Sequence, residues 1–254
     1  MLQRSPVTIL ITGASSGLGA ALARAYAGPN RTLALWGRDR TRLEETAAAC
    51  RSLSANVEIA SFDISDLGRM SRELEALDER IPLDLAILNA GLGGTVPKHL
   101  RAEDSNRARD IALVDFASPV VAASFLAGRM ADRGSGHIVL VGSIAESFPL
   151  PMSPTYSGAK AGLSMFAEAL RIRMKRYGVQ VSLVSPGFID TPMSRSVDSP
   201  KPFLLSADAA ASAIRARLTR GSVRFVLPWP FSVVRAAYRL IPGRISAMLL
   251  TRFD

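Results

Sequence analysis

Residues that form cross-links and metal sites are scarce in this sequence. Cys50 is the single cysteine among 254 residues, so no disulfide can form within the chain. The sequence has two histidines, His99 and His137, and no cysteine–histidine group has the spacing of zinc ligands. These absences predict an intracellular, cytoplasmic protein that binds no metal.

Long apolar runs, linkers and repeats are missing as well. No run approaches the roughly 18 apolar residues that cross a bilayer, and residues 1–6 are too few for a signal peptide. Proline and glycine are scattered, and nothing repeats at a fixed period. The chain is long enough for one large domain. We therefore predict one domain over residues 1–227, with residues 228–254 as a basic amphipathic extension of it.

Acidic residues are few in the last third of the chain. Residues 171–254 contain 14 Lys and Arg and 4 Asp and Glu, whereas residues 1–170 contain 17 and 18. The whole excess of the net charge of +9 therefore lies in the last third. Such an excess indicates a solvated basic face, or a surface for an anionic substrate, an anionic membrane or nucleic acid.

The sequence does contain a regular alternation of strand-like and helix-like segments. The predicted strands are Val7–Thr12, Thr32–Trp36, Val57–Phe62, Leu83–Leu88, His137–Val141, Val179–Val184 and Val223–Val226. The predicted helices are Leu18–Ala27, Arg40–Ala49, Leu67–Leu77, Ala112–Met130, Pro154–Arg176 and Pro202–Leu218. Continuous apolar strands that alternate with helices indicate a doubly wound α/β (Rossmann) fold. We expect a parallel sheet of about seven strands with helices on both faces.

A glycine-rich loop separates the first strand from the first helix. It has the spacing Gly-x-x-x-Gly-x-Gly. Glycines allow a tight turn and a close approach of the backbone to a pyrophosphate, and the helix N-terminus offers free N–H groups and a partial positive charge. We therefore predict a dinucleotide site with contacts from Gly13, Ser15, Ser16, Gly17, Leu18 and Gly19. The alternative is a glycine-rich turn that binds no ligand.

The end of the second strand predicts which dinucleotide binds. Gly37 stands where an acidic residue would hydrogen-bond the adenosine ribose, and the next residue, Arg38, can pair with a 2′-phosphate. This combination favours NADP(H) over NAD(H). The alternative is that Arg38 is a solvent-exposed residue at the start of the next helix.

Three further motifs follow along the chain. Asn89-Ala90-Gly91 ends the fourth strand, Ser143 follows the fifth strand, and Tyr156-Ser157-Gly158-Ala159-Lys160 begins 13 residues later in a predicted helix. Together with the glycine loop, they resemble the short-chain dehydrogenase/reductase family over residues 7–226. The resemblance implies an oxidoreductase that transfers a hydride between a nicotinamide and a carbonyl or hydroxyl group.

Tyr156 and Lys160 lie four residues apart and share one helix face. Because an ammonium stabilises a phenolate, we expect the pKa of Tyr156 to fall below its usual ~10. Such a phenol can donate a proton to a carbonyl oxygen during reduction and accept one during oxidation. Ser143 would hydrogen-bond the same oxygen, and the resemblance implies that Lys160 also holds the nicotinamide ribose. The alternative is that Tyr156 only packs on the sheet.

The resemblance implies further contacts with the cofactor. Asp63 is similar to the residue that hydrogen-bonds the adenine, although it could instead cap a helix. The stretch Asn89, Ala90 and Gly91 would line the central ribose. The loop from Pro186 would hold the carboxamide, with contacts from Pro186, Gly187, Ile189 and Thr191.

One position departs from the family pattern. Where the family has Asn-x-x-Gly in the long helix before the fifth strand, this chain has Asp115 and Ser118. The resemblance implies that this position acts largely through its main-chain carbonyl, through a water linked to Lys160. We therefore retain Asp115 as the fourth catalytic residue and expect its carboxylate to lie near Lys160, where it would oppose phenolate formation at Tyr156.

The expected substrate is apolar. The resemblance implies that the segment after Thr191 covers the substrate, and this segment contains Met193, Val197, Pro202, Phe203, Leu204 and Leu205. The stretch after Ser143 adds Phe148, Leu150 and Met152. These side chains favour an acyl chain, a lipid or a steroid-like ketone, although they could simply pack the lid.

The extension contains two segments in which basic and apolar residues alternate. Phe231, Val234, Tyr238 and Ile241 recur at helical spacing around Arg235 and Arg239, and the second segment is Ile245–Phe253. This pattern indicates a helix on an anionic membrane surface, or one buried in an oligomer interface or over the active site.

Three classes of function are compatible with the sequence. The catalytic set favours an enzyme, because an NADP(H)-binding regulator without turnover would have no need of it. A nucleic-acid-binding module would explain the basic last third, but the sequence contains no recognisable motif that reads RNA or DNA. We expect a ketone or alcohol substrate and no nucleic acid. The resemblance also implies a homodimer or homotetramer paired through the helices Ala112–Met130 and Pro154–Arg176.

Overall fold

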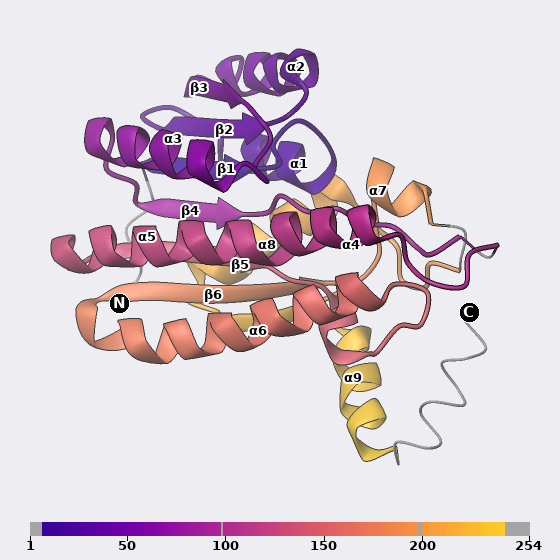
Figure 1. The fold of residues 1–254 in the computed structure, drawn as a ribbon. Helices are drawn as coiled ribbons and strands as arrows, with labels where there is room; N and C mark the ends of the chain where they lie inside the picture. The colour runs from indigo at the N-terminus through magenta and orange to yellow at the C-terminus, as the bar shows by residue number, and fades with distance from the viewer. Residues whose placement is uncertain (1–6, 98, 198–199, 242–254) are drawn as a thin grey trace.

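The fold is built on one parallel β-sheet. The computed structural model describes residues 7–97, 99–197 and 200–241. The seven strands follow the order β3-β2-β1-β4-β5-β6-β9, and all neighbours are parallel. They are β1 (Thr8–Thr12), β2 (Thr32–Gly37), β3 (Asn56–Ser61), β4 (Leu85–Leu88), β5 (Gly136–Val141), β6 (Val179–Pro186) and β9 (Arg224–Leu227). The predicted doubly wound sheet is confirmed (Figure 1).

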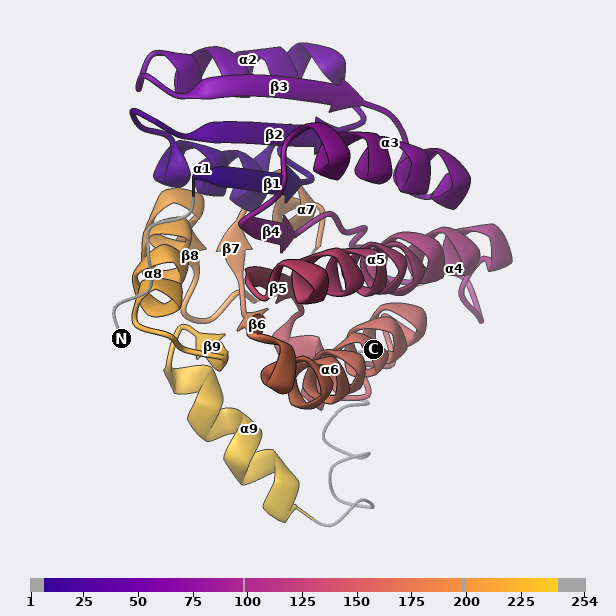
Figure 2. The ribbon, with the colours of Figure 1, turned by 90° about the vertical axis from the view of Figure 1, so that its left-hand side faces the viewer.

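Helices cover both faces of the sheet, and each face has its own apolar core. One face carries α1 (Gly17–Tyr26), α2 (Arg40–Arg51) and α8 (Ala207–Thr219), and the other carries α3 (Leu67–Arg80), α5 (Ser118–Arg133) and α6 (Pro154–Met174). Figure 2 shows α1 and α8 on one side of the strands and α3, α5 and α6 on the other. Successive strand residues point to opposite faces, so Ile9 and Ile11 belong to the first core and Leu10 to the second.

The helix predicted at Ala112–Met130 is longer than the sequence indicated. It begins with α4 (Ser105–Ala112), passes through a π-helical turn at Leu113–Ala117 and continues as α5. The predicted start is wrong because Asp104 caps the helix earlier: its carboxylate accepts a hydrogen bond from the Arg107 N–H at 2.9 Å. The π turn had no signal in the sequence that we recognised.

By length and composition alone, the helix Ser105–Arg133 could cross a membrane, contrary to the expectation from the apolar runs of the sequence. Half of its most apolar stretch of 18 residues is buried inside the protein. Ala123, Leu126 and Met130 have no exposed surface and belong to the core beneath the sheet. The helix therefore packs as a core helix, and such helices pass the same test of length and composition.

The helix predicted at Pro202–Leu218 begins five residues later than expected, at Ala207. The side chain of Ser206 caps it by accepting a hydrogen bond from the Ala209 N–H at 3.2 Å. The preceding residues form the short strand β8 (Leu205–Ser206), which pairs with β7 (Ile189–Asp190). This two-stranded sheet holds the segment that follows β6 beside the carboxyl ends of the strands of the main sheet.

The C-terminal extension contains one described helix, α9 (Pro230–Leu240). It leaves the edge strand β9 and lies near the loop that precedes α6 (Figure 1). Phe231 at its start is 7% exposed, so one face of the helix packs against the domain. The second predicted segment, Ile245–Phe253, lies outside the described residues.

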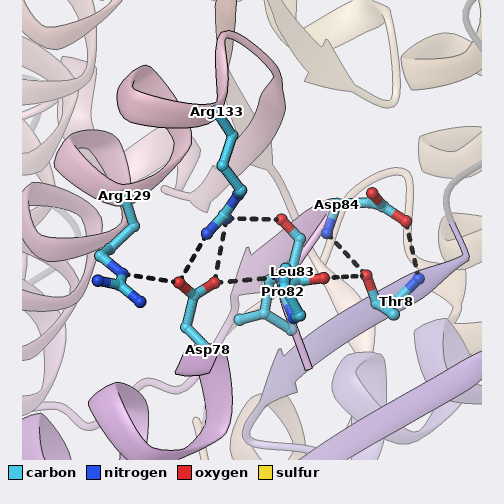
Figure 3. Close-up of polar contacts among 7 residues, drawn as sticks. All are labelled: Thr8, Asp78, Pro82, Leu83, Asp84, Arg129 and Arg133. Carbon is cyan, nitrogen blue, oxygen red and sulfur yellow. Dashed lines mark hydrogen bonds and ion pairs between the residues drawn. The ribbon is translucent and has the colours of Figure 1, made fainter. Parts of the chain in front are cut away.

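A buried polar cluster ties the elements together at the amino ends of the strands (Figure 3). Asp78 of α3 accepts hydrogen bonds from Arg133 at 2.7 Å, from Arg129 at 3.1 Å and from the Leu83 N–H at 3.1 Å. Burial favours a raised pKa, but these hydrogen bonds outweigh it and hold the pKa of Asp78 below its usual value. The charge therefore stays on the carboxylate and links α3, α5 and the start of β4.

Candidate functional site

A cavity of about 1150 Å³ lies at the carboxyl ends of the strands. It spans the point where β1 and β4 diverge in the strand order, which is the usual ligand position in an open parallel sheet. All the residues predicted from the sequence as catalytic or cofactor-binding line this cavity. They are Gly13, Ser15, Ser16, Gly17, Leu18, Gly19, Arg38, Asp63, Asn89, Ala90, Gly91, Asp115, Ser143, Tyr156, Lys160, Pro186, Gly187, Ile189 and Thr191.

The glycine loop has a backbone conformation and close contacts that side chains at its glycine positions would disturb. Gly13 and Gly17 have φ angles of +69° and +54°, which other residues rarely adopt. A Cβ atom on Gly19 would lie 2.1 Å from the carbonyl oxygen of Gly13. The first helical turn of α1 begins without a side-chain cap at Ser16. Its backbone N–H groups are therefore available to an anion, and this geometry fits a dinucleotide pyrophosphate.

Charged side chains gather at the end of the cavity beyond β2 and β3. Arg38 lies 3.6 Å from Asp63, which accepts hydrogen bonds from the Ser65 N–H and hydroxyl at 2.9 and 2.7 Å. These contacts and Arg38 overcome the effect of burial and lower the pKa of Asp63. Asp66 caps α3, so the alternative of a cap at Asp63 is wrong. Sequence reasoning missed Arg42, which also lines this end.

Asn89 fixes the floor of the cavity between β1 and β4. Its side-chain Nδ2 donates to the carbonyl oxygen of Thr12 at 3.1 Å. The N–H groups of Asn89 and Ala90 both donate to the Thr12 hydroxyl at 3.0 Å. A Cβ on Gly13 would lie 2.9 Å from the Ala90 Cα, so the glycine loop and the stretch Asn89–Gly91 pack against each other.

The predicted catalytic side chains converge beyond β5. Lys160 is 4% exposed, and its Nζ lies 3.2 Å from Asp115 Oδ1 and 3.2 Å from the carbonyl oxygen of Val141. Nζ also lies 5.6 Å from the centre of the Tyr156 ring. Ser143 caps a 3₁₀ turn (Ile144–Ser147), lines the same cavity as Tyr156, and its hydroxyl acts to lower the pKa of that phenol. Four side chains from three elements therefore line the same part of the cavity.

The sequence-based expectation of a lowered tyrosine pKa is wrong for the protein by itself. Burial raises the pKa of Tyr156, and the Asp115 carboxylate acts in the same direction. The Lys160 ammonium and the Ser143 hydroxyl act to lower it, but they do not outweigh burial. The pKa of Lys160 is raised although burial opposes this, because the carboxylate of Asp115 holds its charge.

The geometry explains why Asp115 and Ser118 fit at the departure from the family pattern. Asp115 lies in the π turn, and both of its carboxylate oxygens accept from the Leu92 N–H at 3.1 Å. Ser118 Oγ donates to the carbonyl oxygen of Val114 at 2.9 Å, one turn back in the helix. The predicted proximity of Asp115 and Lys160 is confirmed.

The far end of the cavity contains Ser194, which sequence reasoning did not assign to it, and Phe231, for whose helix a place over the active site was one of several alternatives. Ser194 Oγ is buried and, among the described residues, has no hydrogen-bond partner. Phe231 of α9 also lines the cavity, although its helical spacing with Val234 and Tyr238 had indicated a helix with a buried face. In the described part of the chain, no group of three or more His, Cys, Asp or Glu residues is arranged to bind a metal.

Known proteins resemble this chain in sequence. The family model described as short chain dehydrogenase matches residues 7–202. An uncharacterized oxidoreductase of Myxococcus xanthus is 32% identical over 245 residues, which are 96% of each chain. The ketoacyl reductase HetN of Nostoc is 30% identical over 226 residues, covering 84% of this chain and 76% of that protein.

Solved structures share the fold. A short-chain dehydrogenase from Sphingobium yanoikuyae in complex with NADPH superposes with a TM-score of 0.82 at 24% identity, covering 93% of this chain and 97% of the other. The bulky-bulky ketone specific alcohol dehydrogenase from Comamonas testosteroni gives a TM-score of 0.79 at 22% identity, with 94% and 96% covered. The chain belongs to the short-chain dehydrogenase/reductase family of oxidoreductases.

Proposed function

We propose that this protein is an NADP(H)-dependent oxidoreductase that interconverts a carbonyl group and the corresponding alcohol on an apolar substrate. One observation carries the proposal: Ser143, Tyr156 and Lys160 face the same cavity that the glycine loop opens into. A protein that only binds the cofactor requires the loop, whereas a proton donor with a neighbouring ammonium serves a reaction.

Each side chain of the set has a distinct role in this proposal. Tyr156 donates its phenolic proton to the carbonyl oxygen during reduction and accepts it during oxidation. Ser143 hydrogen-bonds the same oxygen, where negative charge develops. Lys160 keeps a positive charge near the phenol and so stabilises the phenolate that proton transfer leaves. The nicotinamide, when bound, supplies or accepts the hydride.

The residues that line the cavity fit the parts of NADP(H) in order. The glycine loop holds the pyrophosphate, and Asp63 and the stretch Asn89–Gly91 serve the adenine and the central ribose. Arg38, together with Arg42, offers a guanidinium group to a 2′-phosphate. The loop Pro186–Thr191, which lines the cavity, contacts the carboxamide in this proposal. The NADPH in the similar Sphingobium yanoikuyae structure supports this choice of cofactor.

Replacing Tyr156 by phenylalanine tests the proposal. The variant keeps the ring but lacks the proton, so NADPH oxidation with a panel of ketones and aldehydes should fall by at least about a hundredfold. Cofactor binding, measured by calorimetry, should stay unchanged. Tyr177→Phe, in the turn that follows α6 at its end far from the cavity, is the matched control and should keep full activity. Substantial turnover by the Tyr156 variant would refute the assigned chemistry.

The same panel separates the proposal from the regulator hypothesis. An enzyme consumes NADPH with at least one carbonyl compound, and Tyr156→Phe stops that consumption. A regulator binds NADPH in the calorimeter and consumes none with any member of the panel. The second outcome would replace the proposed function.

A further inference from the structure

The cavity changes in chemical character along the edge of the sheet. The loops after β2 and β3 form one end, and the loops after β5, β6 and β9 form the other. Six charged side chains line the cavity within the described part of the chain. Arg38, Asp39, Arg42 and Asp63 belong to the first end, and Asp115 and Lys160 pair with each other.

The end beyond β5 and β6 is lined mainly by apolar side chains, among them Phe148, Leu150, Met152, Phe188, Met193 and Phe231. Ser153 and Ser194 add hydroxyl groups there but no charge. A charged group on a substrate would find no partner among the described residues at this end, and burial of an unpaired charge is costly. This end therefore fits an uncharged, apolar substituent.

Phe231 of α9 forms part of this apolar wall and packs directly on the loop after β6. Its ring lies so close to Gly187 that a Cβ there would be 2.3 Å from Phe231 Cε2. The Gly187 N–H donates to the carbonyl oxygen of Leu227 at 2.6 Å. The Phe231 ring also contacts the rings of Phe203 and Phe188, with centroids 5.6 and 6.2 Å away. The ring position is thus set by the backbone of the loop.

A second set of contacts holds the rest of α9 against the turn after Ser143. The carboxylate of Glu146 is 2% exposed, lies 3.5 Å from Arg235 of α9, and accepts from Ser185 Oγ at 2.9 Å. The ring of Tyr238, near the end of α9, meets the ring of Phe148 edge-on with centroids 4.7 Å apart. The helix is therefore fastened at both ends to loops that line the cavity.

We infer that Phe231 of α9 limits the apolar end of the cavity, and that the substrate is an uncharged ketone or secondary alcohol with a bulky apolar substituent that packs against this ring. This inference rests on the proposed function and names the substrate class for the same site. The carbonyl lies at Ser143 and Tyr156, and the substituent extends toward the start of α9.

A series of methyl ketones of increasing chain length tests the inference with NADPH as the reductant. Each methylene that enters the apolar end should raise kcat/KM by about three- to fourfold. The gain should stop at the length at which the chain meets Phe231. Keto acids of equal length should be poor substrates, because their carboxylate would be buried without a partner.

Substitutions of Phe231, with one of Val233 as the control, locate the limit of the cavity. Phe231→Ala should move the plateau to longer or bulkier ketones and change kcat/KM little for the short ones, because it enlarges only the part of the cavity that the short ones do not reach. Val233→Ala, on the same helix with Val233 59% exposed, should leave the profile unchanged. Phe231→Leu keeps an apolar side chain of intermediate size and should give an intermediate profile, so it replaces the alanine variant if that variant does not fold.

A binding measurement gives a readout without turnover. With NADP⁺ present a ketone cannot be reduced, so its dissociation constant can be measured by calorimetry across the same series. Affinity should rise with chain length and shift with Phe231→Ala in parallel with kcat/KM. Turnover that is independent of chain length, or identical profiles for the Phe231 and Val233 variants, would overturn the inference and leave the proposed function intact. Absence of turnover with every ketone would instead contradict the proposed function.

Discussion

Replacing Asp115 by asparagine should move the pH dependence of turnover to lower pH while the enzyme stays active. Asparagine has the same shape and keeps an oxygen that can accept from the Leu92 N–H and from Lys160. It removes a negative charge that raises the pKa values of Lys160 and Tyr156. The phenolate therefore forms more easily in the variant.

The size of the shift follows from the distances. Nζ of Lys160 lies 3.2 Å from Asp115 and 5.6 Å from the centre of the Tyr156 ring, so the carboxylate lies within about 9 Å of the ring. At an effective dielectric constant of about 20, two unit charges about 9 Å apart interact with about 2 kcal/mol. This energy corresponds to a pKa change of about one unit. Burial also raises the pKa of Asp115, although Lys160 and the Leu92 N–H oppose this effect. The shift therefore applies in the pH range in which this carboxylate is ionised.

The assay is the pH profile of kcat in both directions with one working ketone and its alcohol. Reduction needs the phenol, so its rate should decline with rising pH about one unit earlier in the variant. Oxidation needs the phenolate, so its rate should rise about one unit earlier. Glu44→Gln removes the same charge from the exposed surface of α2, and its profile should match that of the unmodified protein.

Two results would refute this reasoning. An unchanged profile for Asp115→Asn would mean that the carboxylate does not act on the group that transfers the proton. Loss of activity would mean that the carboxylate itself is essential and that the asparagine of the family pattern is not its equivalent.

The remaining predictions concern the cofactor and the stability of the fold. The unmodified protein should prefer NADPH over NADH by about tenfold or more, and Arg38→Asp should erase or invert this preference. Arg40→Ser is the control. Equal dissociation constants for both cofactors in the unmodified protein would show that Arg38 contacts no phosphate. Asp78→Asn should lower the free energy of unfolding by about 3 kcal/mol at neutral pH, because it leaves Arg133 poorly paired, whereas Glu75→Gln should change it little. Since the pKa of Asp78 is lowered, this difference should vanish as the pH falls below about 4 and through the folded-state pKa; a difference that persists in acid would contradict the ion-pair explanation.

The sequence determined the architecture and the membership of the site. Apolar strands alternating with helices dictate a parallel sheet covered on both faces, because each strand buries side chains on both sides. The glycine loop, Ser143 and the pair Tyr156 and Lys160 follow strands in order, and the carboxyl ends of parallel strands meet at one edge. For this reason all the predicted residues line one cavity.

Only the tertiary structure decided what depends on contacts between distant segments. The pKa of Tyr156 rises rather than falls, because burial is a property of the packed site and not of spacing in a helix. Asp115 reaches Lys160 through a π turn that no local pattern indicated. The sequence left open on which surface α9 packs. An amphipathic pattern indicates that one helix face is covered, but it does not indicate what covers it. The contacts of Phe231 with Gly187 and of Arg235 with Glu146 direct α9 to the cavity.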